Sequence, residues 1–151
     1  MDIVEFESGH AEAFRVLNEA WIAKHFAIEA KDREVIENPK AEILDKGGRI
    51  FMAVANGAPV GCVAMIPMPD GGFEVAKMTV AEGLRGSGLG RRLMQRCIEE
   101  GEKLGAPRLY LETNSSLAPA RALYLAMGFK DLQAQPTPYA RCDTWMERPL
   151  G

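Results

Sequence analysis

The sequence predicts an α/β domain with a mixed, mostly antiparallel central sheet of about seven strands flanked by helices. Apolar residues first recur with the period of a helix, and from residue 49 they form short runs rich in β-branched side chains, which are typical of strands. Later strands alternate with helical segments again. No repeat, linker or low-complexity segment divides the chain, so we expect one domain over residues 1–151.

The first third of the chain predicts one strand and two helices. Residues 2–6 alternate in polarity as a strand does, and apolar residues follow helical spacing from residue 10 to residue 26. A weaker helical pattern covers residues 32–44, although Asn38-Pro39 interrupts it.

The middle of the chain predicts an antiparallel meander of three strands. The apolar runs at residues 49–55 and 59–67 are joined by Asn56-Gly57, a hairpin signal. Asp70-Gly71-Gly72 makes the next turn, and residues 73–80 form the third strand.

The second half predicts a helix, a strand, a helix and two strands. The first helix covers residues 89–104 and ends at Gly105, because glycine favours the backbone conformation that closes a helix. The other elements are a strand at 108–113, a helix at 118–129, and strands at 129–134 and 142–148.

Composition excludes several classes of protein. The formal net charge of −3 does not favour a nucleic-acid binder, and no apolar segment is long enough for a membrane span or a signal peptide. Three widely separated cysteines, each taken to lie in an apolar periodic segment, fit buried thiols in a reducing cytoplasm. His10 and His25 show no metal-ligand spacing, so we expect no metal.

The most informative segment is a loop with four glycines at residues 83–90, followed at once by a helix. Such a loop lets backbone N–H groups approach an anion, and the helix N-terminus adds a partial positive charge. The loop lacks the Lys-Ser/Thr pair of a P-loop, and the dinucleotide-binding spacing fits it poorly. A purely geometric turn is the alternative.

The loop resembles the pyrophosphate loop R/Q-x-x-G-x-G/A of the GCN5-related N-acetyltransferases, the GNAT superfamily. Arg85–Gly90 match that spacing, and Leu123–Phe129 (LYLAMGF) resemble the downstream signature of the same family. The order of elements also resembles the family over nearly the whole chain. The resemblance implies acetyl-CoA as co-substrate, bound where the parallel fourth and fifth strands splay apart.

The resemblance also implies which residues bind acetyl-CoA. The backbone of the fourth strand would pair with the pantetheine arm, and the loop amides would hold the pyrophosphate. Arg85, Arg91 or Arg92 would meet the 3′-phosphate, unless the two helix arginines only face solvent. Where the family often has an asparagine that contacts CoA, this sequence has Leu117. Asn114 is the candidate to make that contact instead. The implied cofactor-binding residues are Met78, Thr79, Val80, Arg85, Gly86, Ser87, Gly88, Leu89, Gly90, Arg91, Asn114 and Tyr124.

The implied chemistry is acetyl transfer from the thioester to a primary amine by direct attack. Tyr124 matches the family tyrosine that protonates the CoA sulfur, and its alternative is a core tyrosine. Glu74 has the same strand parity as Met78 and Val80 and is the candidate base, because some histone-type members carry a base glutamate there. Glu112 and an ordered water chain are its rivals. A backbone N–H near Met78 would stabilise the oxyanion.

The acceptor stays open, because family members modify antibiotics, polyamines, amino acids, protein N-termini and lysines. Glu29 and Asp32 would attract a cationic amine, whereas Arg141 would anchor a carboxylate. The alternatives to a small-amine transferase are a non-catalytic acyl-CoA-binding or sensing module and a domain that recognises a protein tail. A homodimer through the edge of the last strands is expected by analogy alone. Family resemblance places the acceptor near Trp21, His25, Phe26, Glu29, Asp32, Tyr139, Arg141 and Trp145.

Overall fold

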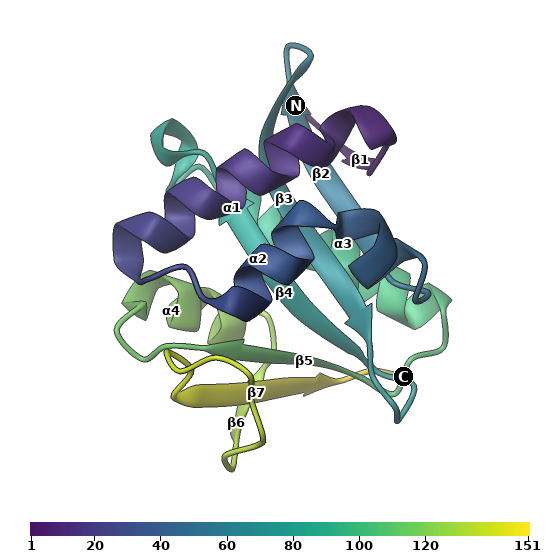
Figure 1. Cartoon of the computed structure of the whole chain (residues 1–151). Coiled ribbons are helices and arrows are strands. Elements are labelled where there is room, and N and C mark those ends of the chain that lie inside the picture. The colour runs from purple at the N-terminus through teal and green to yellow at the C-terminus, as the bar shows by residue number, and fades with distance from the viewer.

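The computed structural model describes all 151 residues and contains a seven-stranded mixed sheet with the strand order β1-β2-β3-β4-β5-β7-β6 (Figure 1). This confirms the predicted α/β architecture and strand number. All neighbouring strands are antiparallel except β4 and β5, which are parallel. The strands are β1 (Asp2–Glu5), β2 (Arg49–Ala55), β3 (Ala58–Pro67), β4 (Phe73–Val80), β5 (Arg108–Thr113), β6 (Lys130–Leu132) and β7 (Thr144–Pro149).

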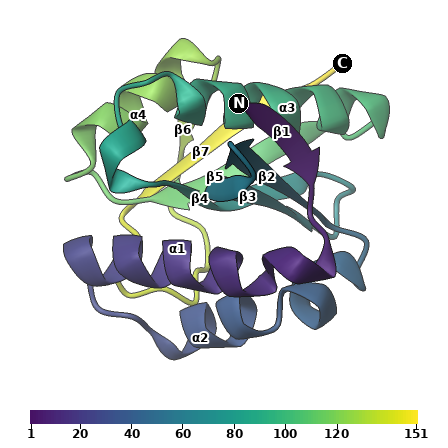
Figure 2. The same ribbon diagram turned by 90° about the horizontal axis from the view of Figure 1, so that it is seen from above.

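Helices cover both faces of the sheet (Figure 2). One core, containing Phe14 and Val35, lies under α1 (Ala11–His25) and α2 (Ala30–Glu37). The other core, containing Leu93 and Cys97, lies on the opposite face under α3 (Leu89–Lys103), and α4 (Ala118–Ala126) packs on the same side. No helix combines the length and the apolar character needed to cross a bilayer.

The second predicted helix is shorter than its sequence pattern suggested. α2 ends at Glu37, and Asn38 has φ −135° and ψ 55°, which is not helical. The cause is Pro39, since a proline disfavours helical backbone in the residue before it. Residues 40–44 then form a separate π-helical turn.

The last two strands enter the sheet in reverse of their chain order. β7 pairs with β5 along six residues, and β6 pairs only with the outer side of β7. The chain between them, residues 133–143, therefore returns across the end of β5. This loop brings Tyr139 and Arg141 to the same end of the sheet as the divergence of β4 and β5.

The parallel strands β4 and β5 are paired only at their beginning. Phe73 lies opposite Leu109 and Glu74 opposite Tyr110, and no further residues of the two strands are paired. The strands then diverge, as predicted, and open a gap in the middle of the sheet (Figure 1).

A β-bulge in β4 changes which face the second half of the strand presents. Ala76 lies opposite Ala64 but Thr79 opposite Cys62, so two residues of β4, Lys77 and Met78, share one partner position. Lys77 adopts φ 54°, a left-handed conformation that is uncommon for a residue other than glycine.

The bulge corrects the predicted parity of Glu74. Ala76, two residues after Glu74, pairs with a residue of the core under α1 and α2, whereas Met78 and Val80 pack against the core under α3. Glu74 therefore faces the α1–α2 side of the sheet, opposite to Met78 and Val80. A plain strand with period two, as assumed from the sequence, would have placed all three on one face.

Candidate active site

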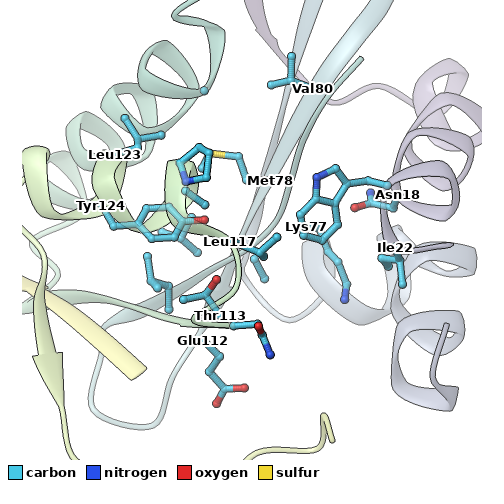
Figure 3. A pocket seen from close by; sticks show the side chains of 18 of the residues that line it. Asn18, Ile22, Lys77, Met78, Val80, Glu112, Thr113, Leu117, Leu123 and Tyr124 are labelled. Atoms are coloured by element: carbon cyan, nitrogen blue, oxygen red, sulfur yellow. The ribbon is translucent and has the colours of Figure 1, made fainter. Parts of the chain in front are cut away.

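A cavity of about 470 Å³ occupies the gap between β4 and β5. Its wall combines both strands, the glycine-rich loop, the start of α3, one side of α4, and residues of α1 and of the loop before β7. Figure 3 shows side chains from α1 and α4 on opposite sides of this space, with Met78 between them. The cavity therefore connects the two faces of the sheet.

The glycine-rich loop offers a row of free backbone donors. The amides of Gly86 and Gly88, and of the first three α3 residues 89–91, have no acceptor within the protein. Gly86 and Gly88 have φ values of 80° and 85°, which explains why glycine stands there. A Cβ atom added at either position would meet no atom within 4 Å, so the backbone is open on the side where a side chain would project. Such amides at a helix N-terminus can bind an anion.

The three arginines near the loop have different positions. Arg85 and Arg91 line the cavity, and Arg91 also donates from Nη1 to the sulfur of Met127 at 3.2 Å. Arg92 does not line the cavity, because its Nη2 donates to the Met1 carbonyl at 3.0 Å. Two of the three predicted phosphate partners are thus at the cavity.

The other predicted cofactor residues divide into two groups. Met78, Val80 and the loop residues 88–91 line the cavity, whereas Ser87 does not. Thr79 is 2% exposed, and its hydroxyl has no hydrogen-bond partner. Its side chain is turned to the face of Cys62, so only its backbone could serve a ligand in the gap.

Tyr124 lies on α4 and its side chain extends into the cavity (Figure 3). Its hydroxyl makes no hydrogen bond in the structure. Burial raises the pKa of Tyr124 to about 12, which keeps the phenol protonated at neutral pH. The hydroxyl can therefore donate a proton or a hydrogen bond to a ligand.

Glu74 and Glu112 line the cavity together but have different surroundings. The oxygens of Glu112 accept hydrogen bonds from Tyr110 at 2.7 Å and Thr137 at 2.6 Å. Glu74 has no hydrogen-bond or ion-pair partner, and burial, aided by the negative charge of Glu112, raises the pKa of Glu74 to about 7. A carboxyl group with that pKa can accept a proton near neutral pH.

Asn114 lines the cavity, but its side chain also holds two loops together. Its Nδ2 donates to the Arg141 carbonyl at 2.7 Å, and its Oδ1 accepts from the Ser116 amide at 2.8 Å. Leu117, at the missing family asparagine, also faces the cavity (Figure 3).

Half of the predicted acceptor residues do not face the cavity. Trp21, Phe26, Tyr139 and Arg141 line it. The remaining four lie elsewhere, and they are His25, Glu29, Asp32 and Trp145.

The predicted charges at the acceptor end pair with one another, which corrects the expectation that they are free for a substrate. Arg141 donates to both oxygens of Asp32 at 2.7 Å, and Lys77 donates to Asp32 at 2.7 Å and to the Tyr139 hydroxyl at 3.1 Å. Although burial opposes its ionisation, these hydrogen bonds lower the pKa of Asp32 to about 2. Glu29 accepts from the Ala140 amide at 2.9 Å and pairs with Arg141. We call Asp32, Lys77 and Arg141 the ion cluster.

Sequence reasoning missed two residues of this region, Lys77 and Asn18. Both line the cavity, yet the side chain of Lys77 is only 6% exposed and Asn18 is 3% exposed. The available signal was a polar residue within an otherwise apolar stripe, since Lys77 interrupts the apolar end of β4 and Asn18 lies on the buried side of α1.

The prediction for Cys142 was wrong, because this residue lies in the loop before β7 and not in an apolar periodic segment. No group of acidic, histidine or cysteine side chains is arranged to hold a metal ion.

Comparisons of sequence identify related proteins. The profile of the acetyltransferase (GNAT) family matches residues 11–129. A protein named IAA acetyltransferase from Azospirillum brasilense is 37% identical over 105 residues, which cover 68% of this chain and 68% of that protein. The uncharacterized N-acetyltransferase YjgM of Escherichia coli is 35% identical over 79 residues, covering 51% of this chain and 47% of that relative.

Solved structures share the fold over the whole chain. An acetyltransferase of the GNAT family from Staphylococcus aureus superposes with a TM-score of 0.91 at 21% identity, covering 99% of both chains. The yncA protein of Salmonella typhimurium, solved with its cofactor acetyl-CoA, superposes with a TM-score of 0.80 at 22% identity, covering 100% of this chain and 94% of that one.

Proposed function

The chain belongs to the acetyltransferase (GNAT) family of acyl-CoA-dependent N-acyltransferases, and we propose that it transfers the acetyl group of acetyl-CoA directly to a primary amine. The observation that carries this proposal is a single cavity with three parts. It joins free loop amides at one end, an unpaired carboxyl with a pKa of about 7, and a protonated tyrosine.

The loop end of the cavity would bind the diphosphate of acetyl-CoA. Its amides have no acceptor within the protein, and Arg85 and Arg91 add positive charge beside them. From there the pantetheine arm would run into the gap between β4 and β5, where the unpaired edge of β4 can bond it as an added strand. Asn114 would contact the pantetheine arm only through the part of its amide that its two loop hydrogen bonds leave free.

The chemistry would take place beside the bulge in β4. The amine nitrogen attacks the thioester carbonyl carbon, and Glu74 accepts a proton from that nitrogen. The C–S bond then breaks, and Tyr124 supplies a proton to the departing CoA sulfur. A backbone N–H near Met78 would stabilise the oxyanion that forms in between. Glu74 is favoured over Glu112 because the oxygens of Glu112 already accept two hydroxyl hydrogen bonds.

Both the relatives and the cavity bear on the class of amine that would accept the acetyl group. One relative is named streptothricin acetyltransferase and another [ribosomal protein bS18]-alanine N-acetyltransferase, so the family offers both small-molecule and protein amines. The acceptor end of this cavity has aromatic walls formed by Trp21, Phe26 and Tyr139. We propose a small primary amine with an apolar substituent that lies against these rings.

The first test is binding of acetyl-CoA, measured by the thermal midpoint and by calorimetry. We expect Gly86→Glu to abolish binding, because a carboxylate would enter the space of the diphosphate. Gly57→Glu is the matched control: Gly57 has φ 79° against 80° for Gly86, and a Cβ at either position meets no atom within 4 Å. Equal binding by both variants would refute the assignment of the loop.

The second test separates a transferase from a CoA-sensing module. Release of free CoA is followed with a panel of aryl-alkyl amines, alkyl diamines and peptide N-termini. We expect amine-dependent release that falls at least a hundredfold in Glu74→Gln and about tenfold or more in Tyr124→Phe, with binding of acetyl-CoA retained. Tight binding without release for any amine would support the sensing module instead.

A further inference from the structure

Asn18 carries a hydrogen-bond acceptor that the protein itself leaves unused. The residue is 3% exposed, and its Nδ2 donates to the Phe14 carbonyl at 2.8 Å and to the Cys62 sulfur at 3.5 Å. Its Oδ1 accepts no hydrogen bond. This oxygen is not one of the polar side-chain atoms that are both fully buried and without a partner. The Phe14 carbonyl can only accept, so the donor end of the amide must face it and Oδ1 must face away.

Asn18 lines the cavity beside the bulge in β4. It contacts Cys62, whose sulfur donates to the Lys77 carbonyl at 3.4 Å. In Figure 3 Asn18 lies on the α1 side of the cavity and Tyr124 on the α4 side, with Met78 between them. The free oxygen is therefore held on the acceptor side of the place where the thioester would react.

Few other charged or amide groups at this end have an oxygen without a hydrogen-bond donor. Lys77 and Arg141 are donors only, and the two oxygens of Glu112 already have hydroxyl donors. Glu74 is free, but the proposed mechanism uses it for the proton that the amine loses. A primary amine has a further N–H that needs an acceptor.

We propose that Oδ1 of Asn18 accepts a hydrogen bond from the N–H that the acceptor amine keeps during attack, and that Asn18 thereby selects amines over alcohols. This inference rests on the proposed acetyl transfer. An alcohol gives its only proton to the base and then presents lone pairs to Oδ1, which is unfavourable. Asn18 is thus a specificity-determining residue for transfer to nitrogen.

Two CoA conjugates test the proposal without knowledge of the natural acceptor. In both, the CoA sulfur carries –CH₂–C(=O)–X–CH₃, where X is NH in the amide and O in the ester. Calorimetry gives the Kd of each conjugate. We expect the wild-type protein to bind the amide about tenfold more tightly than the ester, the size of one neutral hydrogen bond.

Variants assign that ratio to Asn18. Asn18→Leu keeps the branched shape of the side chain without its polar atoms, and Asn18→Ala avoids crowding if the larger leucine causes misfolding. In both variants we expect the ratio to fall to about one. Leu17→Met is the control, since Leu17 lies next to Asn18 but packs in the core under α1 and α2 and does not line the cavity. It should keep the tenfold ratio.

The outcomes distinguish a failure of the proposed role of Asn18 from a failure of the proposed acetyl transfer. A wild-type ratio near one, or a tenfold ratio that survives in either Asn18 variant, overturns the role of Asn18 while acetyl transfer stands. If wild-type protein binds neither conjugate nor CoA itself, the proposed function fails and the inference fails with it.

Discussion

The two ends of the cavity are built in opposite ways. At the donor end, the amides of Gly86, Gly88 and residues 89–91 have no acceptor within the protein, and these residues line the cavity. At the acceptor end, Asp32, Lys77 and Arg141 satisfy one another before any ligand arrives. One end therefore leaves backbone groups free for a ligand, whereas the other uses its charges to hold its own wall in place.

The difference shows that charged residues at a cavity are not by themselves a substrate site. The ion cluster joins α2, the bulge of β4 and the loop before β7, and through Lys77 it fixes a residue with a left-handed backbone. The side chains at this end that still offer a free hydrogen-bond acceptor include Glu74 and Asn18. Stability should therefore depend on the acceptor end, and affinity for acetyl-CoA on the donor end.

Removing the carboxylate of the ion cluster should have the largest effect. Asp32→Asn leaves Lys77 and Arg141 buried without their shared anion, and we expect a loss of about 3–5 kcal/mol in the free energy of unfolding. For a domain of this size the thermal midpoint should fall by roughly 10 °C or more.

An exposed pair of the same geometry provides the control for Asp32→Asn. Arg121 donates to both oxygens of Asp131 at 2.7 Å, as Arg141 does to Asp32, but Asp131 is 55% exposed. Asp131→Asn should hardly change the thermal midpoint, because water screens this pair. Similar midpoints for the two variants would contradict the expectation that the buried ion cluster stabilises the fold more than an exposed ion pair does.

The next largest effect concerns the pH dependence of Glu74. Its raised pKa means that the folded state holds this proton more tightly than the unfolded chain, so stability is lost as pH rises from about 4.5 to about 7. We expect Glu74→Gln to be more stable than wild type by about 3 kcal/mol at pH 8.5 and equal to it below pH 4.5. Denaturation at several pH values measures this.

In the wild-type protein, activity should increase with pH over the range in which stability decreases. A base must be ionised to accept a proton, so kcat/KM for an amine should rise through a pKa near 7. A pH profile without that rise would exclude Glu74 as the base and would favour Glu112 or a water chain.

Asn114 lies between the two ends and can distinguish a structural role from a cofactor contact. Asn114→Ala removes its bonds to the Arg141 carbonyl and the Ser116 amide, and we expect a loss of about 1 kcal/mol in stability. The Kd for acetyl-CoA should change less than threefold. A tenfold weaker Kd with unchanged stability would instead assign Asn114 to the cofactor.

The arginines of α3 should have the smallest effect on stability, because their role should be confined to binding. Arg91→Ala should raise the Kd for acetyl-CoA about three- to tenfold at low salt, with a smaller change at high salt, because Arg91 lines the cavity. Arg92→Ala is the neighbouring control, since Arg92 turns to the Met1 carbonyl. Calorimetry of both variants at two salt concentrations decides whether the charge or its position matters.

The sequence was sufficient for the donor end because that end depends on local backbone conformation. Gly86 and Gly88 occupy left-handed positions immediately before α3, and the loop is short and continuous in sequence. The strands and the helices followed from the same kind of local pattern, whereas the splayed parallel pair was implied by the resemblance to the GNAT family. The exceptions were the end of α2 and the bulge at Lys77, where a proline and one extra residue changed the expected period.

The acceptor end was decided only by the tertiary structure. Asp32 and Lys77 are 45 residues apart in sequence, and Asp32 and Arg141 are 109 residues apart. Their pairing depends on the insertion of β7 between β5 and β6 and on the direction that the bulge gives to Lys77. A loop of glycines carries its conformation in its own residues, whereas a pair of charges exists only where the assembled sheet brings the two side chains together.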